Sequence, residues 1–184
     1  YKRQLVAGSF ERSPQFSEPV LGRPSDLATL TPETMPKDFP PGLSSARRTI
    51  DGGLEPYPTR VAIENEGAAG DAAALLYVRD AIELFMIQVQ GSARIRLPDG
   101  RRLLLTYAGR NGQPYTSIGR LLVERGEIPA AEMSLARLKQ WVRDKGQGRG
   151  EAGRVLLQEN KSYVFFRLDG TLVTRQQVME AAAR

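Results

Sequence analysis

Apolar and polar positions divide the chain into a proline-rich first third and a later part with regular patterns. Nine prolines fall within residues 1–58. Because proline removes a backbone donor and fixes φ, their spacing excludes long helices and central strands there. We expect an extended arm with edge strands such as Phe16 to Leu21, and a mobile loop from Thr31 to Ser45.

Clear periodic patterns begin after this arm. A short helix is predicted from Arg60 to Glu66 because Gly67 ends it, and a strand is predicted from Ala73 to Asp80. The run from Leu84 to Val89 is apolar at both alternating sets of positions. That pattern predicts a strand in the centre of a sheet, with both faces covered.

The remaining pattern predicts a hairpin followed mainly by helices. A Pro98-Asp99-Gly100 turn joins strands from Ala93 to Leu97 and from Arg102 to Tyr107. Further elements are helices capped by Ser117 and Ser134, a helix from Glu151 to Glu159, a strand from Tyr163 to Leu168, and a last helix from Arg175 to Ala183. This order predicts an α+β, mainly β fold: a small β-barrel-like antiparallel sheet with several peripheral helices.

Composition narrows the chemistry. The chain has 184 residues, enough for one domain, and contains no cysteine and no histidine. Thiol nucleophiles, histidine triads and Cys/His metal sites are therefore excluded, and no cofactor is expected. The net charge of +5 comes from scattered residues without interleaved aromatics, which disfavours nucleic acid as a partner. No apolar run is long enough to span a bilayer, and the start at Tyr1 suggests a mature or excised fragment.

The first candidate site is Gln88-Val89-Gln90-Gly91-Ser92. On the predicted strand, the two glutamine amides share one face and are followed by a hydroxyl. Such a row of donors and acceptors suits sugar hydroxyls, each of which gives and takes a hydrogen bond. The alternative is a strand with polar residues facing solvent.

The second candidate is the glycine-rich loop from Tyr107 to Tyr115. Its glycines permit positive φ or close contact with a ligand, and Asn111-Gly112 is a strong turn dipeptide. The two tyrosines could stack on sugar rings. The alternative is a plain loop in which the tyrosines are packing anchors.

Charged residues elsewhere give weaker signals. Arginines cluster on the predicted hairpin and could attract acidic groups, although a solvated hairpin face is the more common explanation; they are Arg94, Arg96, Arg101 and Arg102. Glycosidases usually need paired carboxylates. No recognisable acid/base pair occurs, and surface salt bridges explain the candidates Asp80, Glu83, Asp99, Glu124 and Glu127.

An ordered set of motifs over residues 15–167 resembles the MltA family of lytic transglycosylases. These motifs include Phe85 with Gln90-Gly91-Ser92, Tyr107-Ala108-Gly109-Arg110-Asn111-Gly112, Pro114-Tyr115, Ser117-Ile118-Gly119-Arg120, and Ser162-Tyr163-Val164-Phe165-Phe166. The resemblance implies a two-domain enzyme with a double-psi β-barrel and an inserted domain across a groove. Residues 1–168 would be the insert with its proline-rich arm, and 169–184 a helical tail of unknown role.

The resemblance also implies a function. The family cleaves the bond between N-acetylmuramic acid and N-acetylglucosamine in peptidoglycan and forms a 1,6-anhydro end. The expected glycan-binding residues are Gln90, Gly91, Ser92, Tyr107, Asn111, Gly112 and Tyr115. The family's catalytic aspartate lies in an Asp-Val-Gly-Gly-Ala-like motif that we do not find after Leu168. We therefore expect this chain to lack it and to depend on a C-terminal barrel half, in a periplasmic, outer-membrane-associated protein.

Two other functions stay open at this point. One is a stand-alone carbohydrate-binding module that has lost catalysis, and the less favoured one is a basic nucleic-acid-binding barrel. The main hypothesis requires the Gln90 segment and the Asn111 loop to come together as one glycan-holding wall.

Overall fold

The computed structural model describes residues 4–5 and 8–172. Backbone contacts divide the chain into two compact units, each made of separate stretches. Unit 1 contains the described residues up to Arg23, Ala72–Gly109 and those from Val164 onward, and unit 2 contains Pro24–Asp71 and Arg110–Tyr163. The chain therefore interleaves two bodies. The predicted division after residue 168 stays a prediction, although a strand of unit 1, Val164–Leu172, runs across that position.

Unit 1 combines two open sheets with one helix. Its elements are β1 (Gln4–Leu5), β2 (Gly8–Ser9), β3 (Glu18–Leu21), β7 (Ala74–Val78), α2 (Ala81–Gln90), β8 (Ser92–Arg96), β9 (Arg102–Arg110, whose last residue falls in unit 2) and β10 (Val164–Leu172). One sheet has the order β1-β8-β9-β10 and the other β2-β7-β3. The β8–β9, β2–β7 and β3–β7 pairs are antiparallel, and β1–β8 is parallel. The predicted hairpin is confirmed.

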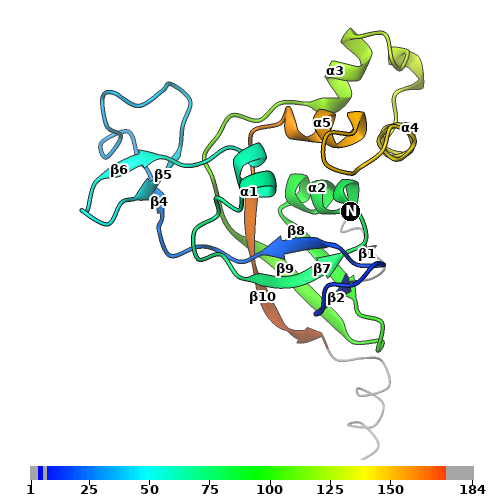
Figure 1. Cartoon of the computed structure of the whole chain (residues 1–184), viewed down its shortest axis with the longest axis horizontal. Helices are drawn as coiled ribbons and strands as arrows, with labels where there is room; N and C mark the ends of the chain where they lie inside the picture. The colour runs from blue at the N-terminus through cyan, green and yellow to red at the C-terminus, as the bar shows by residue number, and fades with distance from the viewer. Residues whose placement is uncertain (1–3, 6–7, 173–184) are drawn as a thin grey trace, which may run out of the picture. The chain divides into compact units, whose positions relative to one another are not determined.

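The core of unit 1 lies between these strands and α2. Inward residues of the hairpin, including Ala93, Ile95, Leu103 and Leu105, pack with apolar side chains from β3, β7, α2 and β10. Figure 1 shows α2 over the strands of this unit, and α2 contacts β3, β7, β8 and β10. The strict alternation of buried and exposed residues along β8 leaves its other face outside this core.

The prediction of a central strand at Leu84 to Val89 is wrong, because this segment is helical. The side chain of Asp80 accepts a hydrogen bond of 3.0 Å from the backbone N–H of Glu83 and caps the first turn of α2. Gly91 ends the helix in the left-handed conformation, with φ of 70°. The buried residues Ala81, Ile82, Leu84, Phe85, Ile87 and Gln88 form a wide helical stripe against the core. An apolar run on both alternating faces fits such a stripe as well as a strand.

Unit 2 contains a small antiparallel sheet and a group of helices. Its elements are β4 (Leu27–Thr29), β5 (Ser45–Arg48), β6 (Leu54–Pro56), α1 (Arg60–Glu66), α3 (Ile118–Glu124), a 3₁₀ turn η1 (Ala130–Glu132), α4 (Leu135–Asp144) and α5 (Ala152–Gln158). The sheet order is β4-β5-β6. Figure 1 shows α3, α4 and α5 gathered together, and the helices predicted in this region are confirmed.

A buried arginine organises the centre of unit 2. Arg60 is 1% exposed and donates to the backbone carbonyl of Asn160 at 2.9 Å and that of Ser162 at 2.6 Å. It also pairs with Glu64 at 3.0 Å. Burial lowers the pKa of Arg60, and the Glu64 carboxylate opposes that shift. These bonds compensate the guanidinium for its loss of hydration. The two bonds to backbone carbonyls also connect α1 to the segment before β10.

The α+β class is confirmed, with mostly antiparallel strand pairs. Within residues 4–5 and 8–172 the strands form three open sheets, none of which closes into a barrel. The predicted helix from Arg175 to Ala183 lies outside the described residues. None of the helices in the described part of the chain is both long and apolar enough to cross a membrane.

Candidate functional site

The first predicted segment lies at the end of α2 and the start of β8, in unit 1. Gln90 is the last residue of α2 and is exposed, while Gly91 and Ser92 are partly exposed. A Cβ placed on Gly91 would meet no atom within 4 Å, so the backbone there is open to an approaching molecule. This geometry presents an amide, a bare backbone and a hydroxyl in sequence order.

The prediction that Gln88 and Gln90 share one face is wrong. Successive helical residues turn by about 100°, so residues two apart point in nearly opposite directions. Gln88 is 4% exposed on the core side, and neither atom of its amide has a hydrogen-bond partner among the described residues. Gln90 therefore stands as the only amide of this pair at the surface.

Tyr107 lies beside this segment in the same unit. Ser92 pairs with Thr106 across the β8–β9 ladder, which places Tyr107 next to the position opposite Ser92. Tyr107 is 49% exposed, so its ring lies at the surface rather than in the core. Gln90, Gly91, Ser92 and Tyr107 thus lie near one another along the backbone at the open end of the hairpin. Because side chains alternate along a strand, Ser92 and Tyr107 point to opposite faces of the β8–β9 ladder.

The other three predicted residues, Asn111, Gly112 and Tyr115, belong to unit 2. Asn111 is fully buried and its amide is committed: Nδ2 donates to the carbonyls of Pro58 at 2.8 Å and Lys161 at 2.9 Å. Its Oδ1 accepts from the backbone N–H of Tyr163 at 2.8 Å. Contact with a sugar would require breaking these bonds, so Asn111 holds the loop in place.

Gly112 is also committed to packing inside unit 2. Its φ is 74°, and a Cβ placed on it would lie 2.3 Å from the backbone nitrogen of Ser45. The close backbone approach predicted for this glycine is therefore made to β5 of the same chain. Gln113 adds a further tie, since its Nε2 donates to the carbonyl of Tyr57 at 2.6 Å. The loop is rigidly held, and Tyr115 is displayed from it at 58% exposure.

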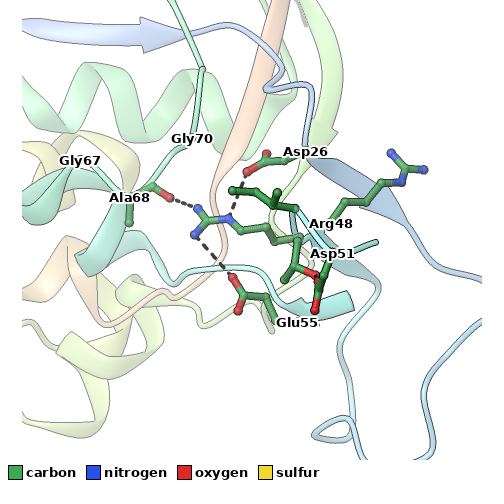
Figure 2. Close-up of a pocket in the computed structure, with 10 residues that line it drawn as sticks. Asp26, Arg48, Asp51, Glu55, Gly67, Ala68 and Gly70 are labelled. Carbon is green, nitrogen blue, oxygen red and sulfur yellow. Dashed lines mark hydrogen bonds and ion pairs between the residues drawn. The ribbon is translucent and has the colours of Figure 1, made fainter. Parts of the chain in front are cut away.

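A wide pocket that the sequence did not indicate lies beside the β4-β5-β6 sheet of unit 2. It has a volume of about 740 Å³ and is lined by Asp26, Arg47, Arg48, Thr49, Ile50, Asp51, Glu55, Gly67, Ala68 and Gly70. Figure 2 shows dashed interactions converging from Asp26, Ala68 and Glu55, while Arg48 extends away. The pocket wall is a network around the Arg47 guanidinium.

Most groups of that network are paired within unit 2, although Nε of Arg47 is buried without a hydrogen bond among the described residues. Arg47 lies 3.1 Å from Asp26, 3.8 Å from Glu55 and 5.0 Å from the centre of the Tyr57 ring. Tyr57 donates to Asp26 at 2.9 Å, and burial together with this bond raises the pKa of Tyr57 well above its usual range. These groups brace the sheet rather than offer free chemistry.

The candidate carboxylates have structural partners. Asp99 pairs with Arg101 at 2.7 Å and Glu124 with Arg120 at 2.6 Å. Hydrogen bonds from the backbone and side chain of Arg101 lower the pKa of Asp99, which is the wrong direction for a general acid. Two of the expected surface salt bridges are therefore present, and Asp80 serves instead as a helix cap.

Comparisons with known proteins agree on one family. The profile described as the MltA specific insert domain matches residues 1–167. Membrane-bound lytic murein transglycosylase A of Escherichia coli K12 is 40% identical over 103 residues, covering 55% of this chain and 27% of that protein. The Vibrio cholerae enzyme of the same name is 38% identical over 111 residues, covering 60% and 29%. The chain thus spans less than a third of the length of these relatives.

Solved structures give the same result for the fold. A membrane-bound lytic murein transglycosylase from Agrobacterium tumefaciens matches with a TM-score of 0.80 and 28% identity, over 93% of this chain and 47% of that one. Escherichia coli MltA with bound chitohexaose matches with a TM-score of 0.64 and 27% identity, over 91% and 41%.

Proposed function

Since this chain belongs to the MltA family, whose insert-domain profile covers most of its length, we propose that it forms the glycan-binding part of a peptidoglycan lytic transglycosylase. The observation that carries this proposal is the open Gln90-Gly91-Ser92 segment at one end of the hairpin, with Tyr107 exposed on the neighbouring strand. Amide, hydroxyl and aromatic groups together match the alternating polar edges and apolar faces of sugar rings. The solved relative that holds chitohexaose supports a glycan as the ligand.

We propose two roles for the seven predicted residues: contact with the glycan and support of the loop that carries Tyr115. Gln90, Ser92 and Tyr107 in unit 1, and Tyr115 in unit 2, would contact the glycan, since their side chains are at least partly exposed. Gly91 would let the glycan approach the backbone. Asn111 and Gly112 would hold the loop that displays Tyr115, because their groups are buried and bonded within unit 2.

The reaction would be the cleavage of the β-1,4 bond between N-acetylmuramic acid and N-acetylglucosamine, with formation of 1,6-anhydro-N-acetylmuramic acid. One carboxyl group protonates the glycosidic oxygen and then takes the proton of the muramic 6-hydroxyl as that oxygen attacks C1. This acid would come from a C-terminal barrel half, which would also complete the proposed barrel. The chain's share is the binding and orientation of the strand, which lowers the barrier by positioning.

The cellular setting is proposed on the same basis. Relatives named membrane-bound lytic murein transglycosylases support a periplasmic protein associated with the outer membrane. The alternative is a non-catalytic peptidoglycan-binding module. A coding sequence that continues into a barrel half with the aspartate motif would favour the enzyme, and one that ends without it would favour the module.

Binding of chitohexaose tests the proposal directly. Gln90→Ala and Tyr107→Ala should each weaken binding by about tenfold, since each removes a polar or stacking contact. Gln140→Ala, an exposed glutamine on α4, is the matched control and should leave binding unchanged. Equal affinities of Gln90→Ala and the control would contradict the assigned site. Release of anhydromuropeptides by this chain alone would contradict the division of labour.

A further inference from the structure

The outward face of the β8–β9 hairpin carries three exposed arginines. Along β8, Arg94 and Arg96 are exposed and alternate with the buried residues Ala93, Ile95 and Leu97. Arg102, at the start of β9, is exposed as well. In the part of the chain that the structure describes, none of these three side chains forms an ion pair. The fourth hairpin arginine, Arg101, is engaged with Asp99.

Two of these arginines oppose each other directly. Arg96 and Arg102 are partners across the antiparallel ladder. Like charges in that position repel and destabilise a hairpin. A sequence under selection for stability alone would place an opposite charge or a neutral residue at one of the two positions. An anion bound from outside the hairpin would relieve this repulsion.

The row of arginines is continuous with the proposed glycan site. Ser92, Arg94 and Arg96 point to the same side of β8, and outward residues two apart along a strand are spaced by about 7 Å. Arg94 thus follows one step after the Gln90-Gly91-Ser92 segment, and Arg96 follows two steps after it. Leu104, the cross-strand partner of Arg94, is half-buried and gives the face a small apolar area.

The nearest acidic group on the neighbouring strand is already occupied. Asp169 of β10 accepts a hydrogen bond of 2.7 Å from Thr106 and lies 3.1 Å from Arg167. These two bonds hold the pKa of Asp169 below its usual range, so it remains an acceptor for its own partners. Asp169 is therefore engaged with Thr106 and Arg167 rather than with the three arginines.

We propose that this face, defined by Arg94, Arg96 and Arg102, binds the carboxylate-bearing peptide stem of the glycan strand. The inference rests on the proposed glycan-binding function and names a second part of its ligand. Guanidinium groups bind carboxylates through paired N–H donors, and Leu104 fits small methyl side chains. A strand seated at Gln90 to Ser92 would direct a stem along β8, where the charges lie.

The test uses the full 184-residue chain and two ligands that differ only in the stem. These are soluble glycan strands with their peptide stems, and the same strands after an amidase has removed the stems. The variant Arg96→Gln/Arg102→Gln removes two charges from the face. The control Arg48→Gln/Arg149→Gln removes two exposed charges in unit 2 and matches the change in net charge.

The wild-type chain should bind stem-bearing strands more tightly than stem-free strands. Arg96→Gln/Arg102→Gln should lose at least about tenfold in affinity for stem-bearing strands, which corresponds to one charge-assisted hydrogen bond. Its affinity for stem-free strands, and both affinities of the control, should be unchanged. Added salt should reduce the stem preference in the wild-type chain and have little effect in the variant.

Several results would overturn the stem inference alone. They are equal affinity of the wild-type chain for both ligands, an equal loss on both ligands in the variant, or an equal loss in the control. Arginine-dependent binding to vesicles of anionic phosphatidylglycerol without a stem preference would assign the face to a lipid surface instead. Failure of the wild-type chain to bind even stem-free strands would instead remove the glycan-binding proposal itself.

Discussion

Asn111 and Tyr163 are joined by two reciprocal hydrogen bonds. The backbone N–H of Asn111 donates to the carbonyl of Tyr163 at 2.9 Å, and the backbone N–H of Tyr163 donates to Oδ1 of Asn111 at 2.8 Å. The amide Nδ2 of Asn111 adds its two bonds to backbone carbonyls. One side chain thus replaces strand pairing at the point where β9 ends and β10 is about to begin.

Asn111→Asp should therefore destabilise the protein strongly. The new carboxylate keeps the size of the side chain but cannot donate to the carbonyls of Pro58 and Lys161. We expect the free energy of unfolding to fall by roughly 2–4 kcal/mol, because two buried acceptors lose their donor. Urea denaturation measures this loss. A drop no larger than that of an exposed substitution such as Gln140→Ala would show that the network contributes little.

Two glycines with similar positive φ values provide a matched comparison. Gly91 and Gly112 have φ of 70° and 74°. Alanine at Gly91 meets open space and should cost only the backbone strain, about 1–2 kcal/mol. Alanine at Gly112 adds a steric overlap with Ser45, so its total cost should be about 3–5 kcal/mol. Equal midpoints of thermal unfolding for the two variants would contradict the packing described for the loop.

The buried and exposed arginine pairs should differ sharply in their effect on stability. Arg60→Leu removes a buried partner of Glu64, with side-chain exposures of 2% and 8% for the pair, and leaves the carbonyls of Asn160 and Ser162 without this donor. The free energy of unfolding should fall by about 3–5 kcal/mol. Arg120→Leu breaks the surface pair with Glu124, where Arg120 is 76% exposed, and should give no measurable change. Chemical denaturation of both variants provides the comparison.

The pair of Arg125 and Glu159 should make stability depend on acid. The guanidinium holds both carboxylate oxygens at 2.7 Å and 2.6 Å, and this hydrogen bonding lowers the pKa of Glu159 below its ordinary value of 4.5. A carboxyl group with a lowered pKa in the folded state contributes stability above its unfolded pKa. That contribution is lost as the pH falls through the lowered value.

Glu159→Gln should consequently flatten the decline in stability between about pH 5 and about pH 3. Arg125→Gln should flatten it to the same extent, and the double variant should add nothing further. Unfolding midpoints measured across this pH range test the prediction. Additive effects of the two single variants would show that the acid dependence arises from other groups.

Local signals in the sequence were sufficient for much of the fold. The hairpin followed from its Pro98-Asp99-Gly100 turn, and α1 ended at Gly67, whose φ is 69°. The prediction of a strand at Leu84 to Val89 was wrong because this run is also compatible with a helix. An apolar stripe that covers most of a helix places apolar residues at both alternating sets of positions. The cap at Asp80 and the left-handed Gly91 were the signals that distinguish the two, since both flank the run at helical positions.

The candidate site was predictable only where exposure follows from local structure. Gln90 lies at the end of α2 and Tyr107 lies within β9, and both are exposed. The role of Asn111 could not be foreseen, because its acceptors, Pro58 and Lys161, are 53 and 50 residues away along the chain. The sequence likewise did not show that Gln88 is buried and Gln90 exposed, because this difference depends on their positions around helix α2.

Because the two units alternate along the chain, neither can be expressed or excised as one continuous segment. The chain leaves unit 1 after Arg23 and again after Gly109, and it returns at Ala72 and at Val164. Unit 2 therefore consists of two separate segments of the chain, Pro24–Asp71 and Arg110–Tyr163. Cleavage at two positions cannot release it as one continuous polypeptide. Transfer of unit 2 to another scaffold must include both segments, and each segment must be joined to the scaffold at both of its ends, which makes four junctions.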